Sequence, residues 1–171
     1  MSGPSAQQSG IKPLYTPAER QRRDASGWTL VQGILAPIQF LVFLVSIALV
    51  CRFLLTGEGE TAATASVVLK TLVLYTIMVT GSIWEKAVFG KYLFAEAFYW
   101  EDMVSMLVLA LHTAYLASVT FGFLSVEAQM WLALAAYAAY VVNAAQFILK
   151  LRAARLQRPD GEPRVFAEAA R

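Results

Sequence analysis

Three carboxylic acids near the middle of the chain are the residues best suited to catalysis. Glu85 follows Trp84, and the pair Glu101 and Asp102 follows Trp100. The segment from Trp84 to Asp102 contains seven aromatic and six charged side chains. A carboxylic acid enclosed by aromatic rings can act as a general acid. An aromatic belt that anchors a protein at a membrane surface has the same composition, so the residues alone leave both interpretations open.

Further polar side chains occur inside apolar stretches, at spacings that give single helix faces. One such stripe contains Gln32, Gln39 and Ser46, and another contains Asn143, Gln146 and Lys150. Each stripe predicts either hydrogen bonds between packed helices or contacts with a polar edge of a ligand.

Two ionisable side chains lie deep within apolar segments. Lys70 is costly at such a depth unless it snorkels, pairs with an acid such as Glu58 or Glu60, or contacts a ligand. His112 shares a helix face with Glu101, and also with Ser105 and Tyr115. A lone imidazole there can form a structural hydrogen bond, ligate the metal of a tetrapyrrole or transfer a proton.

The composition excludes several classes of protein. The 171 residues are 58% hydrophobic and only 15% charged, which is unlike a soluble enzyme or a disordered chain. One cysteine and one histidine can form neither a disulfide scaffold nor a Cys/His zinc cage. The net charge is +2 and no basic face is apparent, so we expect no nucleic-acid partner.

Four apolar stretches predict an all-α membrane protein whose four transmembrane helices form an up-down bundle. The predicted spans are 28–51, 61–83, 103–126 and 128–149, inside a transmembrane domain of residues 28–150. Residues 1–27 are expected to form a cytoplasmic leader, and residues 151–171 a cytoplasmic, mobile tail. The aromatic segment then becomes a loop at the cytoplasmic side.

The distribution of cations predicts the orientation of these spans, because cytoplasmic loops retain lysine and arginine. Twelve of the fourteen cations fall in the leader, the central loop and the tail: Lys12, Arg20, Arg22, Arg23, Lys86, Lys91, Lys150, Arg152, Arg155, Arg158, Arg164 and Arg171. We therefore expect both termini in the cytoplasm.

Several long strings closely resemble the 3-vinyl bacteriochlorophyllide hydratase family. They are LYTPAERQRRDAS from Leu14, WTLVQGILAPIQF from Trp28, GSIWEK from Gly81 with WED from Trp100, and YVVNAAQF from Tyr140. The resemblance implies an enzyme of bacteriochlorophyll synthesis, in the inner membrane of a photosynthetic bacterium. It would add water to the C3 vinyl group of chlorophyllide a or 3-vinyl bacteriochlorophyllide a and form a 1-hydroxyethyl group.

The chemistry of this reaction suggests roles for the residues already singled out. An acid protonates the terminal carbon of the vinyl group, the macrocycle delocalises the resulting cation, and water adds at the adjacent carbon. No redox cofactor is needed, and the magnesium belongs to the substrate. Glu85, Glu101 and Asp102 are the candidate acids and bases, and Asp102, at a helix start, is the one we expect to stay ionised.

The remaining candidate residues would bind the pigment. We expect His112 to ligate the substrate magnesium and Lys86 or Lys91 to pair with the substrate propionate. Additional contacts are assigned to Trp84, Trp100, Asn143, Gln146 and Gln39. A non-catalytic pigment-binding or assembly subunit, or a small transporter, remains an alternative to the enzyme. Self-association and contacts with pathway enzymes or membrane lipid also stay open.

Overall fold

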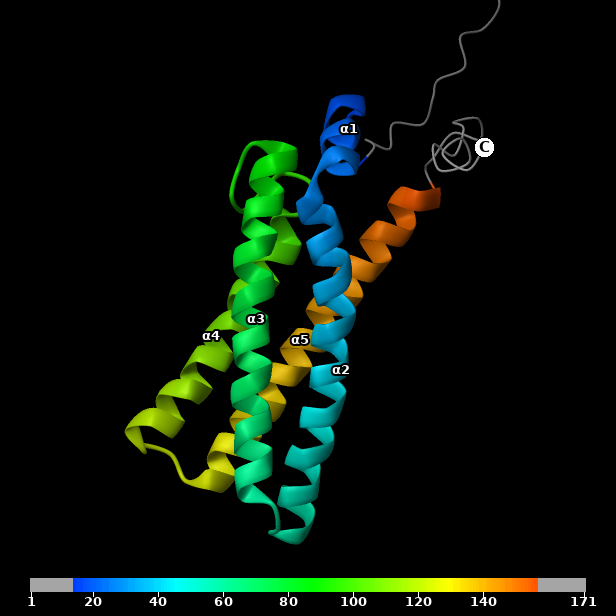
Figure 1. The fold of residues 1–171 in the computed structure, drawn as a ribbon. Helices are drawn as coiled ribbons and strands as arrows, with labels where there is room; N and C mark the ends of the chain where they lie inside the picture. The colour runs from blue at the N-terminus through cyan, green and yellow to red at the C-terminus, as the bar shows by residue number, and fades with distance from the viewer. Residues whose placement is uncertain (1–13, 157–171) are drawn as a thin grey trace, which may run out of the picture.

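Four long helices and one short one make up the described part of the chain (Figure 1). The computed structural model describes residues 14–156. The helices are α1 (Pro17–Ala25), α2 (Gly27–Thr56), α3 (Glu60–Phe89), α4 (Tyr99–Phe121) and α5 (Val126–Leu156). The four long helices, α2 to α5, are long and apolar enough to cross a membrane. The prediction of an all-helical, four-span protein is therefore confirmed.

The long helices run alternately up and down in two hairpins, with α2 packed mainly on α3 and α4 mainly on α5. One end of the bundle carries α1, the connection from α3 to α4 and the last turns of α5, as Figure 1 shows. The two hairpins meet where Phe43 of α2 contacts Tyr137 and Tyr140 of α5, at ring-centroid distances of 5.4 and 5.1 Å. From this contact toward the end of the bundle that carries α1, helices α2 and α5 diverge (Figure 1).

The helices differ in length from the predicted spans. α3 continues beyond residue 83 to Phe89, so Trp84 and Glu85 lie in its last turns rather than in a loop. α4 ends at Phe121 and not at residue 126, because Gly122 follows in the left-handed conformation (φ 66°). α5 continues past residue 149 to Leu156, so the first part of the predicted tail is helical. The rest of that tail lies outside the described residues.

A short helix in the leader was not predicted. Thr16 and Glu19 form a capping box at the start of α1, with Pro17 at the first helical position. Ser26 adopts an extended conformation and separates α1 from α2. Tyr15, just before α1, is buried against Val88 and Phe98, which attaches this short helix to the end of the bundle.

Candidate active site

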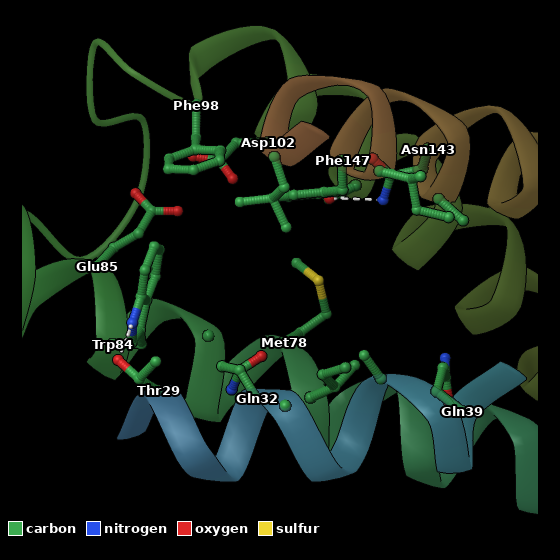
Figure 2. A pocket seen from close by; sticks show the side chains of 18 of the residues that line it. Thr29, Gln32, Gln39, Met78, Trp84, Glu85, Phe98, Asp102, Asn143 and Phe147 are labelled. Atoms are coloured by element: carbon green, nitrogen blue, oxygen red, sulfur yellow. Dashed lines mark hydrogen bonds between the residues drawn. The ribbon is translucent and has the colours of Figure 1, made fainter. Parts of the chain in front are cut away.

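A large cavity lies between α2, α3 and α5, at the end of the bundle that α1 covers (Figure 2). Its volume is about 1040 Å³, at the upper limit of the roughly 300–1,000 Å³ that small-molecule sites occupy. Phe40 of α2 and Ile148 and Leu151 of α5 line it and are 49%, 65% and 40% exposed. The cavity is therefore open to the outside of the bundle, and it is large enough for a flat macrocycle.

Two of the three candidate acids meet in the wall of this cavity. Glu85 near the end of α3 and Asp102 in the first turn of α4 both line it, and they are only 5% and 3% exposed. The two carboxyl groups are neighbours and interact electrostatically. Because two buried, neighbouring carboxylates repel each other, a state in which the pair retains one proton is favoured.

The loop between α3 and α4 supplies two consecutive backbone donors to this pair. The Phe94 N–H donates to Asp102 Oδ2 at 2.7 Å, and the Ala95 N–H donates to Glu85 Oε2 at 3.3 Å. Phe94 has φ 59°, which is unusual for a residue other than glycine. This strained backbone directs two successive N–H groups at two acids, as in an anion-binding nest.

Aromatic side chains enclose the acid pair. Trp84 lines the cavity, and its Nε1–H donates to Thr29 Oγ1 of α2 at 3.0 Å. Phe98 packs on the Trp84 ring with centroids 5.7 Å apart, and stacks on Phe147 of α5 at the same distance. Trp100, in contrast, is 71% exposed and does not line the cavity. Of the two Trp-Glu pairs in the sequence, only Trp84 and Glu85 therefore belong to the cavity wall.

The predicted amide stripes divide between the cavity and the helix interfaces. Gln39 and Asn143 both line the cavity. The Asn143 amide donates to Ser105 Oγ at 2.8 Å, whereas its oxygen and both polar atoms of Gln39 are buried without a hydrogen-bond partner among the described residues. Gln146 lies outside the cavity lining, and Ser46 bonds to Tyr137 between helices.

The third candidate acid has a different environment. Glu101 accepts a hydrogen bond from Lys150 Nζ of α5 at 2.5 Å, and its side chain is 9% exposed. It does not line the cavity. Lys150 lies on the same face of α5 as Asn143 and Gln146, and it reaches the level of the bundle at which α4 begins. This register brings it next to Glu101, in the first turn of α4. Glu101 therefore fixes α4 to α5, and the candidate acids that face the cavity are Glu85 and Asp102.

Three proposed substrate contacts also lie outside the cavity lining. Lys86 donates to the carbonyl of Gly90 at 2.9 Å and is exposed, as is Lys91. His112 is fully buried among α4 and α5; its Nδ1–H donates to the Val108 carbonyl, and its ring lies 5.8 Å from Tyr137. These positions do not support contacts of Lys86, Lys91 or His112 with a ligand in the cavity.

The snorkelling and ion-pair interpretations of Lys70 were wrong. Lys70 is fully buried, and its Nζ has no hydrogen-bond partner among the described residues, so it neither snorkels nor pairs with Glu58 or Glu60. Glu58 instead pairs with Arg52, at 3.5 Å. The ammonium group lies 3.6 Å from the centre of the Tyr140 ring. The helix register explains this, because Lys70 faces α5 on the same side of α3 as the buried Leu74.

The cations that do line the cavity were not among the predicted site residues. They are Arg20 and Arg23 of α1 and Arg155 of α5. The leader was expected to be cytoplasmic and no helix was predicted in it, although the capping-box pattern of Thr16 and Glu19 in the sequence indicates a helix there.

Comparison with known proteins identifies the family. A family model described as 2-vinyl bacteriochlorophyllide hydratase matches residues 15–153. The chain belongs to the 2-vinyl bacteriochlorophyllide hydratase family. The 2-vinyl and 3-vinyl names refer to the same substituent, so the resemblance drawn from the sequence is confirmed.

Two members of the hydratase family show how close the similarity is. The 2-vinyl bacteriochlorophyllide hydratase of Rhodobacter capsulatus is 64% identical over 153 residues, which cover 90% of this chain and 89% of that protein. The protein of the same name from Cereibacter sphaeroides is 61% identical over 153 residues, covering 90% and 95%. No solved structure matches the chain significantly.

Proposed function

We propose that this member of the hydratase family adds water to the vinyl group of a bacteriochlorophyllide inside the α2–α3–α5 cavity, with Glu85 and Asp102 as the acid and base. Family membership makes the chain a hydratase of bacteriochlorophyll biosynthesis. The observation that supports the site is the pair of neighbouring, buried carboxyl groups in the wall of a cavity of macrocycle size. A pair of this kind can donate one proton and accept another.

The reaction uses these two capacities in turn. Glu85 donates its proton to the terminal CH2 of the vinyl group, and the positive charge that develops on the adjacent carbon is delocalised over the macrocycle. Water then attacks that carbon and releases a proton to the carboxylate pair. One water is consumed, a 1-hydroxyethyl group forms, and the pair regains its starting protonation.

The surroundings favour a division of roles within the pair. Asp102 accepts the shorter backbone hydrogen bond and lies in the first turn of α4, where the helix N-terminus stabilises negative charge. Glu85 has the longer bond, to Ala95, and an aromatic neighbourhood. We therefore assign the transferable proton to Glu85 and the negative charge to Asp102. That charge would also stabilise the cationic intermediate.

The test is hydration by purified protein in detergent or nanodiscs. Wild-type protein mixed with the vinyl pigment should give the hydroxyethyl product, seen as a blue shift of the Qy band. The double variant Glu85→Gln, Asp102→Asn should bind pigment without converting it. Conversion by the double variant would contradict the role of the pair, and binding without conversion by wild type would indicate a pigment-binding subunit instead.

We further propose that the protein lies in the inner membrane with both termini in the cytoplasm. The twelve-to-two distribution of cations supports this orientation, and the fold is compatible with it, because α1, the α3–α4 loop and the end of α5 share one end of the bundle. A reporter protein that is active only in the cytoplasm should be active when it is fused after Arg171. Activity of a periplasmic reporter at that position would overturn the orientation.

A further inference from the structure

The charged residues that line the cavity are unevenly distributed. Among residues 14–156, its charged lining consists of the two acids Glu85 and Asp102 and three arginines, Arg20, Arg23 and Arg155. The arginines come from opposite ends of the sequence, two from α1 and one from the last turns of α5. Figure 1 shows that these two elements lie at the same end of the bundle.

Several contacts fix α1 in position over this end. Tyr15 is 4% exposed, and its ring stacks on Phe89 with centroids 5.8 Å apart. The Arg23 guanidinium lies 4.7 Å from the centre of the Tyr15 ring, and it pairs with Asp24. The backbone carbonyl of Arg23 accepts a hydrogen bond from Thr29 Oγ1 at 2.6 Å. Arg23 is thus oriented before any ligand binds.

We propose that Arg20, Arg23 and Arg155 form the binding site for the propionate carboxylate of the pigment. The proposal rests on the proposed function, because it takes the substrate to be a bacteriochlorophyllide. Arginine suits this role, since its planar guanidinium can donate two parallel hydrogen bonds to one carboxylate. An apolar macrocycle can then enter the bundle while its charged group remains at the boundary with water.

The chemistry of the substrate agrees with this position. The ring that carries the vinyl group and the ring that carries the propionate are neighbours in the macrocycle, so both substituents can face one end of a cavity. Glu85 and the arginines share that end. The opposite edge of the macrocycle would extend toward Gln39, twelve residues and about 18 Å along α2 from Gly27.

The position of the arginines also gives a basis for specificity. A pigment esterified at the propionate has no charge for the arginines to bind, and its alcohol tail would have to pass between α1 and α5. The enzyme should therefore select the free acid over the ester. This assignment replaces Lys86 and Lys91, whose side chains lie outside the cavity lining.

Affinities for the free-acid pigment and its methyl ester test the proposal, measured by titration of each pigment in detergent. Charge-assisted hydrogen bonds correspond to about 10- to 150-fold in affinity, so wild type should prefer the acid by a factor in this range. The triple variant Arg20→Gln, Arg23→Gln, Arg155→Gln should lose this preference while its affinity for the ester is unchanged. Arg22→Gln and Arg152→Gln, on the same helices but outside the lining, are the matched controls and should keep the wild-type ratio.

The possible outcomes separate this proposal from the proposed function. Ester binding by the triple variant shows that the variant is folded. A wild-type ratio in the triple variant, or equal affinity of wild type for acid and ester, overturns the arginine site. The ratio of the two affinities is measured without turnover. If wild type prefers the acid but does not hydrate the pigment, the catalytic role of the carboxyl pair is contradicted and the arginine site is still supported.

Discussion

Replacement of Glu85 by glutamine is the most direct test of the catalytic chemistry, because the structure isolates a single effect. The amide oxygen can still accept from the Ala95 N–H, so the hydrogen bond of this side chain to the loop is retained. What the variant lacks is a proton that can be transferred to carbon. We therefore expect normal insertion into the membrane and normal pigment binding.

The magnitude of the loss follows from the role of a general acid. Such an acid contributes about 10²- to 10⁴-fold, which equals about 2.7 to 5.4 kcal/mol of transition-state stabilisation at 1.36 kcal/mol per tenfold. We expect kcat of Glu85→Gln to fall by this factor while the Kd for pigment changes less than about threefold, because the amide has the size and polarity of the acid.

The assay follows the Qy shift under single-turnover conditions, with pigment binding measured separately. Glu60→Gln is the matched control, since Glu60 is exposed at the opposite end of the same helix. A kcat for Glu85→Gln within tenfold of wild type, at unchanged pigment affinity, would refute the assignment of Glu85 as the proton donor.

Three further predictions concern buried polar groups. Lys150→Met should lower the free energy of unfolding by about 1–3 kcal/mol, because it leaves the Glu101 carboxylate unpaired. The loss is smaller than for a fully buried pair, since the side chains of Lys150 and Glu101 are 26% and 9% exposed. Adding Glu101→Gln should restore most of the thermal stability in detergent. Lys70→Met should raise Tm, because it removes a buried cation whose described contact is the Tyr140 ring; a lower Tm would show that this contact outweighs desolvation. Gln39→Leu should stabilise the pigment-free protein by about 1–3 kcal/mol, because both polar atoms of the amide are buried without a partner among the described residues, yet it should weaken pigment binding about 2- to 12-fold. A variant that is more stable and binds pigment as tightly as wild type would contradict a contact between Gln39 and the ligand.

The sequence predicts the fold well because span length and hydrophobicity are local properties. Four apolar stretches are sufficient to expect four helices, and short connections make them antiparallel. Helix ends are less predictable, since apolarity stops at the membrane boundary whereas hydrogen bonding continues. The extension of α3 to Phe89 and of α5 to Leu156 arises in this way.

The candidate site was predictable in part. The aromatic environment of Glu85 and Asp102 is visible in the sequence, but their contact depends on how the loop folds back, with Phe94 in an unusual conformation. Glu101 is adjacent in sequence to Asp102, yet it points toward α5. One residue of helix rotation, about 100°, separates a cavity-lining acid from a structural one, and sequence alone does not give the rotation of a helix in its bundle.

The opening of the cavity between α2 and α5 affects how the enzyme meets its substrate. The rim residues Phe40, Ile148 and Leu151 are apolar and exposed, so in a bilayer they would contact acyl chains. A pigment dissolved in the membrane could then enter sideways, and its product could leave the same way, without crossing water. The concentration that governs the rate would be the number of pigment molecules per lipid. Diluting enzyme-containing vesicles with buffer should leave the turnover rate unchanged, whereas adding lipid at constant pigment should lower it, the behaviour known as surface dilution.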